Sequence, residues 1–203
     1  MDSYAFPRQT WPMMKSIFLG LLSVAFLSAT NPVRAAGEPE ISTGQIAEDG
    51  SNIAWGHAVG VIDKPIDEVL PVVVDYASYV KFMPNFKKSQ VLAQRGNRAM
   101  VYMEVSVASD TFTLWGQLNF SEIAREGDTR IIEARLLEGN MNAFSATWRL
   151  TPVDDGAGTE VDFKIYVDPH MPLPSSVFSR ENERAAGKTI RALRTRVVET
   201  IRS

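Results

Sequence analysis

The side chains that most often carry out enzyme chemistry are scarce in this sequence. Its 203 residues include no cysteine and two histidines, His57 and His170. Catalysis by a cysteine/histidine pair and zinc sites built on several cysteines or histidines are therefore excluded. No Gly-rich phosphate-binding loop is present, and neither histidine has a serine or aspartate at a spacing that indicates a triad. We expect both histidines to be structural, and we predict no metal site and no cofactor.

Carboxylates are the remaining candidates for acid or base chemistry. Glu138 and Asp110 lie at the ends of predicted strands, where contact with water accounts for them. A catalytic acid or base must come within about 3 Å of the group with which it exchanges a proton. Because the apolar face described below carries almost no polar side chains, we predict no catalytic residue and expect binding rather than catalysis.

The N-terminal segment predicts export. Lys15 precedes an uncharged apolar run over 17–29, and the small residue Ala35 precedes the expected cut. This is the pattern of a secretory signal peptide over 1–35, so we expect a periplasmic or secreted protein that begins at Ala36, with a cut after Ala36 as the alternative. The apolar run is shorter than the about 20 residues that span a bilayer. A translation start at Met14 would give a more compact signal.

The spacing of apolar residues predicts the elements of the remaining chain. Residues 36–52 lack periodicity and are predicted to be a flexible leader, so the domain is expected over 53–203. A strand over 53–62 precedes two short helices, over 66–74 and 77–82. Alternation of apolar and polar residues between Gly, Asn and Asp turns then predicts six strands. They are expected over 89–94, 99–107, 111–123, 130–138, 143–152 and 159–167.

A long helix is predicted from Ser175 or Ser176 to the C-terminus. Its apolar residues recur at steps of three and four and form one stripe: Phe178, Ala186, Ile190, Leu193, Val197 and Ile201. Basic residues on the other faces are interleaved with glutamates, so we expect a solvated surface, and transient contact with a membrane is left open. A formal net charge of -3 argues against nucleic acid as a partner.

Alternation also sorts the strands into an apolar face and a polar face. The long helix is the element that can cover the apolar face, so the sequence predicts an α+β fold with about seven antiparallel strands wrapped on one helix. Large side chains of the sheet oppose Ala185, Ala186 and Gly187 of the helix, which leaves room for a cavity. In the alternative, the aromatic side chains fill the core: Phe112, Phe144, Trp148 and Phe163.

This order of elements resembles the helix-grip architecture of the START-like (SRPBCC) superfamily. Residues 62–69 and 75–86, with Tyr79 shortly before Phe82-Met83-Pro84, are similar to the opening of its polyketide cyclase/dehydrase and coenzyme Q-binding families. The segment 171–174 before the long helix is similar as well, and the resemblance covers 51–203. It implies that an apolar ligand, such as a lipid, isoprenoid quinone, sterol or polyketide, binds between sheet and helix.

The resemblance also implies which residues form the site. The expected lining is Met103, Val105, Phe112, Leu114, Leu118, Leu136, Phe144, Trp148, Ile165, Asn182, Ala186 and Ile190, with Tyr79, Phe82 and Met83 at the entrance. Asn182 interrupts the apolar stripe of the helix. It is expected either to offer a hydrogen bond to a ligand head group or to be an internally satisfied polar residue.

The sequence is compatible with three functions. The first is an exported carrier of a hydrophobic small molecule or lipid (isoprenoid, quinone, acyl chain or polyketide-like). The second is a cyclase/dehydrase-type enzyme acting in the same cavity, for which the opposite strand phase would turn polar side chains inward: Tyr102, Glu104, Trp115, Gln117, Arg135 and Tyr166. The third is an interaction module with a filled core, in which Tyr102, Trp115 and Tyr166 form an exposed patch.

Overall fold

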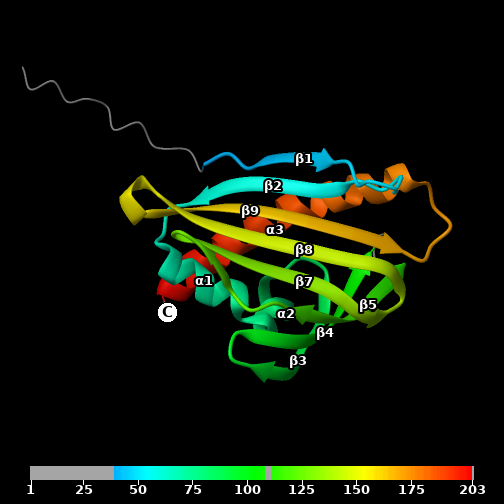
Figure 1. Ribbon diagram of the computed structural model, residues 1–203, viewed down its shortest axis with the longest axis horizontal. Coiled ribbons are helices and arrows are strands. Elements are labelled where there is room, and N and C mark those ends of the chain that lie inside the picture. The colour runs from blue at the N-terminus through cyan, green and yellow to red at the C-terminus, as the bar shows by residue number, and fades with distance from the viewer. Residues whose placement is uncertain (1–38, 108–110, 203) are drawn as a thin grey trace, which may run out of the picture. The chain divides into compact units, whose positions relative to one another are not determined.

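One antiparallel sheet dominates the computed structural model, which describes residues 39–107 and 111–202 (Figure 1). Within these residues the sheet has nine strands in the order β1-β2-β9-β8-β7-β5-β4-β3, and β6 pairs with β7 beside that path. The strands are β1 (Ser42–Ile46), β2 (Trp55–Ile62), β3 (Phe86–Arg95), β4 (Arg98–Val107), β5 (Phe112–Phe120), β6 (Ala124–Glu126), β7 (Thr129–Gly139), β8 (Met141–Val153) and β9 (Gly158–Pro169). The predicted signal peptide, 1–35, lies outside the described residues.

The helices are α1 (Ile66–Val74), α2 (Tyr79–Phe82) and α3 (Ser175–Arg202), with 3₁₀ turns η1 (Tyr76–Ser78) and η2 (Asp154–Gly156). α3 runs along one face of the sheet, behind β2 and β9 in the view of Figure 1. The short helices follow β2, as predicted. The structure therefore confirms the α+β helix-grip fold, with β1 and β6 in addition to the expected strands.

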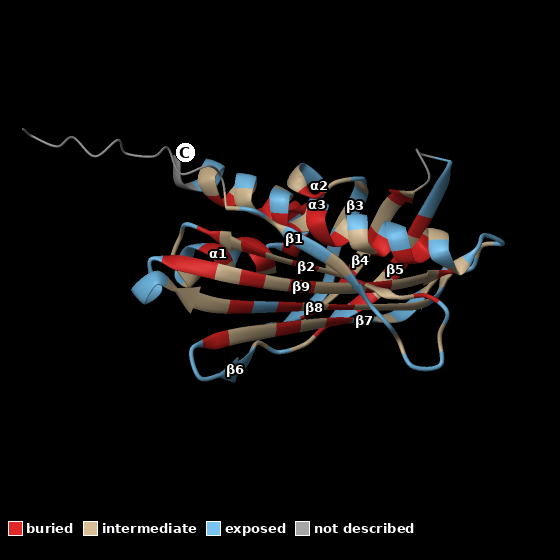
Figure 2. Ribbon diagram, turned by 90° about the horizontal axis from the view of Figure 1, so that it is seen from above, coloured by how far each residue is buried: buried red, intermediate tan, exposed pale blue. Residues whose placement is uncertain are grey.

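The two faces of the sheet separate as the alternation predicts. The apolar set points toward α3 and forms the core, in which Val101, Ile132, Leu150 and Val161 are fully buried. Figure 2 shows buried residues alternating with less buried ones along the central strands. Along β2, every second residue from Gly56 to Ile62 is buried. Side-chain direction in a strand has a period of two, so this agreement means that the predicted strand phase is correct.

β1 is the main difference from the expected elements. It lies within the stretch predicted to be a flexible leader, and it pairs with β2 along its whole length. Thr43 and Gln45 also hydrogen-bond through their side chains to the carboxylate of Glu183 on α3. β1 is a short edge strand that is mostly exposed on both faces. Such a strand leaves no alternation in the sequence, which is why the pattern missed it.

The C-terminal end of α1 is held by a buried tyrosine. α1 runs from Ile66 through Pro71 to Val74. The hydroxyl of Tyr79 donates a hydrogen bond to the carbonyl oxygen of Val73 at 2.5 Å. Carbonyls in the last turn of a helix lack partners within the helix, so this bond satisfies one of them. Tyr79 thereby ties α1 to the segment that leads into β3.

Candidate functional site

Two glycines of β2 determine how closely α3 lies on the sheet. A Cβ atom on Gly56 would stand 1.9 Å from the backbone oxygen of Asn182, so the helix backbone passes directly over this residue. At Gly60, the corresponding position lies 3.2 Å from the side chain of Ile190. Residues 56 and 60 are on the same face of the strand, and neither has a side chain to hold the helix away. α3 is therefore seated tightly on β2.

The start of β2 is also clamped to α3 by two side chains. The backbone N–H of Ala54 donates to Ser179 Oγ at 2.9 Å. The backbone oxygen of the same residue accepts from Asn182 Nδ2 at 3.0 Å. The backbone N–H and C=O of Ala54 are thus both satisfied by side chains of α3 rather than by another strand. The close contact lies at this side of the sheet, and the space between the layers opens toward β4, β5, β7 and β8.

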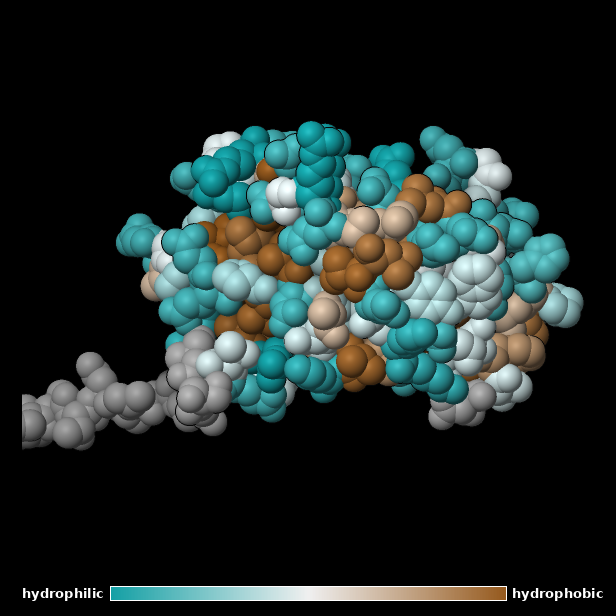
Figure 3. Space-filling model, turned by 90° about the horizontal axis from the view of Figure 1, so that it is seen from below, coloured by the Kyte–Doolittle hydropathy of each residue, from teal (hydrophilic) through white to brown (hydrophobic). Residues whose placement is uncertain are grey.

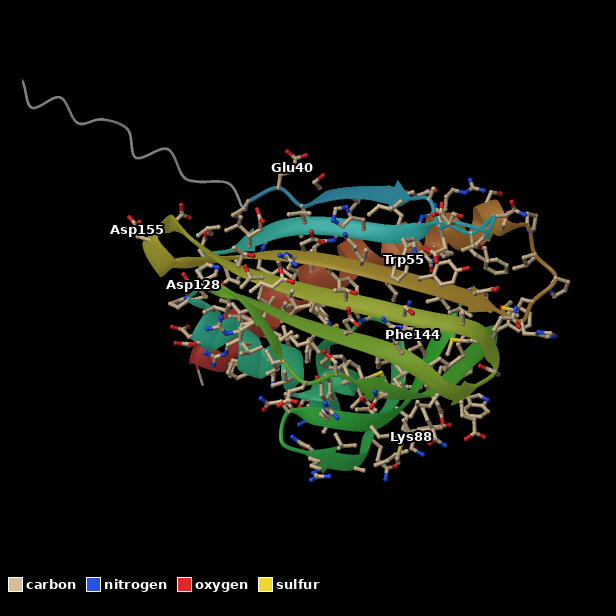
Figure 4. The ribbon with its side chains drawn as sticks, viewed as in Figure 1. Glu40, Trp55, Lys88, Asp128, Phe144 and Asp155 are labelled. Carbon is tan, nitrogen blue, oxygen red and sulfur yellow. The ribbon has the colours of Figure 1, made fainter. Side chains whose placement is uncertain are left out.

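A cavity of about 520 Å³ occupies that space. Its deepest walls are aromatic and aliphatic side chains of the sheet. Leu118, Phe120, Trp148 and Phe163 are nearly fully buried, and the rings of Trp148 and Phe163 lie 4.1 Å apart between centroids. Phe144, labelled on β8 in Figure 4, is half-buried and also lines the cavity. The volume is in the usual range for a small-molecule pocket, about 300–1,000 Å³.

The wall that α3 contributes is more polar toward the outside. Glu181, Arg184 and Lys188 line the cavity and are exposed, and Arg184 Nη1 pairs with Glu181 Oε1 at 2.6 Å. Ala185 lies between them and leaves a short side chain on this wall. The cavity therefore has an apolar interior and a charged rim along one edge of the helix. That distribution suits a molecule whose apolar part lies in the interior and whose polar part lies at the rim.

The structure brings most of the predicted lining residues together. The cavity is bordered by Met103, Val105, Leu114, Leu118, Phe144, Trp148, Ile165 and Asn182, and by Tyr79 and Met83 of the predicted entrance. That a ligand contacts them stays a prediction. These residues come from β4, β5, β8, β9, α3 and the α2 region, so elements far apart in the sequence form one wall.

Five predicted site residues do not line the cavity. Ala186 and Ile190 are fully buried and pack in the core. Leu136 packs over Gly116, which has no side chain to occupy that place. Phe112 begins β5 at the end of a hairpin and is 48% exposed. Phe82 packs beside Tyr79, with Arg196 above its ring.

The seating of α3 explains why Ala186 and Ile190 lie in the core rather than at the cavity. Because Gly56 brings the backbone at Asn182 onto β2, residues 186 and 190 point into the closed part of the core. The cavity is lined instead by the neighbouring stripe, with Phe178, Glu181, Ala185 and Lys188 at steps of three and four. Successive residues of a helix point about 100° apart around its axis. A difference of one position along α3 therefore decides whether a side chain faces the cavity or the core.

The polar face of the sheet carries residues that were expected to serve the alternative functions. Tyr102 and Trp115 stack there at 6.1 Å between centroids, and Lys88, labelled in Figure 4, lies 5.0 Å above the Tyr102 ring. Tyr166 does not join them. It lies on β9 and is buried beside Trp55 of β2, in the other half of the sheet. The predicted three-residue patch is therefore not formed, and the polar set expected for an inward-facing active site lies outside the cavity.

The face shown in Figure 3 is a mixture of apolar and hydrophilic side chains. Brown patches are separated there by teal ones, and no single apolar surface covers the whole view. Scattered apolar side chains are normal on a protein surface. The apolar interior of the cavity is thus the more informative feature.

Titratable groups of the lining offer little for proton transfer. Burial raises the pKa of the Tyr79 hydroxyl well above its usual range, so this group stays protonated and bonded to Val73. Glu181, Arg184 and Lys188 are at the exposed rim. His57 pairs with Asp162 and His170 with Asn142, and neither histidine borders the cavity. In the described part of the chain, no cluster of three side chains suited to a metal ion occurs.

A model of the family described as polyketide cyclase/dehydrase and lipid transport matches residues 62–194. The chain belongs to this family. The match runs from the end of β2 to the second half of α3, so it includes all of the residues that line the cavity. No curated protein matches the sequence.

Solved structures share the fold of this family member at low sequence identity. A STAR-related lipid transfer protein from Xanthomonas axonopodis has a TM-score of 0.68 at 18% identity, over 77% of this chain and 93% of its own. Human StAR-related lipid transfer protein 5 has a TM-score of 0.68 at 13% identity, over 84% and 90%. The Zhui aromatase/cyclase from Streptomyces sp. R1128 has a TM-score of 0.56 at 16% identity, over 81% and 98%. At these identities the likeness establishes the fold.

This polyketide cyclase/dehydrase and lipid transport family member has its cavity between the sheet and α3, within the matched residues. None of the described helices is long and apolar enough to cross a membrane.

Proposed function

We propose that this protein is an exported carrier that holds a hydrophobic small molecule or lipid between the sheet and α3. The observation that carries the proposal is the cavity of about 520 Å³ whose interior is formed by buried apolar side chains such as Leu118, Trp148 and Phe163. Burial of apolar ligand surface contributes about 25 cal/mol per Å². An isoprenoid, quinone, acyl chain or polyketide-like molecule would therefore bind mainly by leaving water.

Binding is favoured over catalysis by the side chains that line the cavity. Its interior has aromatic and aliphatic groups, and the hydroxyl of Tyr79 is committed to the carbonyl of Val73. The charged groups Glu181, Arg184 and Lys188 stand at the rim in contact with water. A cyclisation or dehydration would need an acid or base aligned on the buried part of the substrate.

Filling the cavity tests the proposal. The substitution Ala185→Trp places a large ring in the lining, whereas Thr195→Trp adds the same ring at an exposed position of α3 that does not border the cavity. We expect native mass spectrometry and organic extraction to find a co-purifying apolar molecule with the wild type and the Thr195 variant. The Ala185 variant should lose it while keeping its circular dichroism spectrum. Retention of the molecule by the Ala185 variant, or a wild type that binds no apolar probe, would refute the carrier.

Export is tested separately. The apolar run over 17–29 behind Lys15 supports a cleaved signal, and the expected mature chain begins at Ala36 or one residue later. N-terminal sequencing of the protein recovered from the exported fraction would show this. A protein that stays with the cell interior and keeps its first 35 residues would refute export without affecting the cavity.

A further inference from the structure

Asn182 is a polar side chain in the apolar wall of the cavity. It is 3% exposed, and it lies on α3 between Phe178 and Ala185, which line the cavity with it. Val167 of β9 is opposite. Buried asparagines normally have hydrogen bonds for both ends of the amide, because an unpaired polar atom loses its contact with water. The hydrogen bonds of the Asn182 amide therefore show whether either end is left for a ligand.

The nitrogen end of the amide is fully used by the protein. Asn182 Nδ2 donates to the backbone oxygen of Ala54 at 3.0 Å and to that of Val167 at 3.4 Å. Both acceptors are carbonyl oxygens, which cannot donate. The opposite assignment of the amide would place Oδ1 against two oxygens, so the orientation is determined. The oxygen end must then point away from both carbonyls.

The oxygen end has no partner in the protein. Within the described residues, Asn182 makes only the two hydrogen bonds of its nitrogen. The described buried atoms that are fully enclosed and unpartnered are Tyr76 Oη and Arg194 Nε, so Asn182 Oδ1 borders open space. Because Asn182 is buried and lines the cavity, that open space is the cavity.

We propose that Asn182 Oδ1 accepts a hydrogen bond from a hydroxyl group of the ligand, which makes the cavity selective for apolar alcohols or phenols. This rests on the carrier function proposed above and specifies its ligand. A molecule whose oxygen atoms only accept, such as an ether or a quinone, leaves Oδ1 unpaired. The corresponding alcohol or quinol satisfies it. Leaving a buried acceptor unpaired lowers affinity by about fivefold or more.

Matched ligand pairs test the proposal on the wild-type protein. 1-Dodecanol and its isomer 1-methoxyundecane differ in the ability to donate a hydrogen bond, and 2-naphthol and 2-methoxynaphthalene repeat the comparison on a ring skeleton. Titration calorimetry should show that the hydroxyl member of each pair that binds does so about fivefold or more tightly. Equal affinities within a pair would overturn the assignment of Asn182 while leaving the carrier function intact. If none of the four ligands binds, the carrier function fails, and the assignment with it.

A variant pair locates the selectivity. Asn182→Ala removes the acceptor and should bring the alcohol down to the affinity of the ether. Ser179→Ala, one turn earlier on α3, removes another buried group that bonds to Ala54 but does not line the cavity, and it should keep the difference. A discrimination that survives in a folded Asn182 variant would overturn the proposal. If that variant does not fold, the wild-type ligand pairs still decide.

Discussion

Placing one methyl group on Gly56 is the sharpest test of how α3 is seated. In the substitution Gly56→Ala, the new Cβ would lie 1.9 Å from the oxygen and 2.0 Å from the carbonyl carbon of Asn182, and 2.4 Å from the nitrogen of Glu183. Ordinary contact for a Cβ begins near 3.4 Å. All three atoms belong to the helix backbone, so no side-chain rotation relieves the clash. Helix and strand must separate by about 1.5 Å.

The expected cost follows from what that separation breaks. Overpacking of a core typically costs about 1–3 kcal/mol. The contact here is with backbone, and the hydrogen bonds of Ala54 to α3 are next to it, so we expect about 3 kcal/mol or more. For a domain of this size that corresponds to a fall in Tm of about 6–12 °C. The cavity should change shape as well, because its α3 wall moves.

Two other glycines serve as controls in the same urea and thermal unfolding series. A Cβ added to Gly44 on β1 would have nothing within 4 Å, so Gly44→Ala should be neutral or stabilising by about 0.5–1 kcal/mol. Gly60 would meet only side-chain atoms, at 3.0–3.3 Å, and Gly60→Ala should cost about 1 kcal/mol. If the free energy of unfolding of the Gly56→Ala variant lies within about 0.5 kcal/mol of the wild-type value, this close approach does not seat the helix.

The two buried tyrosines near α1 should respond differently to loss of the hydroxyl. Tyr79→Phe leaves the carbonyl of Val73 without its partner and should lower the free energy of unfolding by about 1–3 kcal/mol in urea, whereas Tyr76→Phe should be neutral or stabilising because Tyr76 Oη is buried without one. Equal costs would contradict this. Burial raises the pKa of both hydroxyls above the ordinary value, so the folded protein keeps protons that the unfolded chain releases above about pH 10. Their contribution to stability is fully present below that pH and falls as pH rises, by about 1.4 kcal/mol per unit for each tyrosine. Tyr76→Phe should make the plot of unfolding free energy against pH less steep above pH 10, and an unchanged slope would argue against the buried hydroxyl.

Local patterns predicted the elements and faces of the sheet well. Alternation identified β2 and the strands from β3 to β9 other than β6, and it assigned Val101, Leu118 and Trp148 to the inner face, where the structure has them. The stripe on α3 was also predicted. These features arise from short-range periodicity, which each segment carries by itself. β1 and β6 escaped detection because they are short and mostly exposed.

The sequence by itself thus determined an antiparallel sheet with one apolar face, a long helix to cover it, and a chain without cysteine or histidine chemistry. The tertiary structure decided which stripe of α3 meets the core and which meets the cavity, so that Ala186 is enclosed and Ala185 lines the open space. It also decided the roles of the two ends of the Asn182 amide. A helical period defines a stripe but not its rotation relative to a sheet. That rotation depends on the contact of Gly56 with Asn182, two residues far apart in the chain, which no local pattern contains.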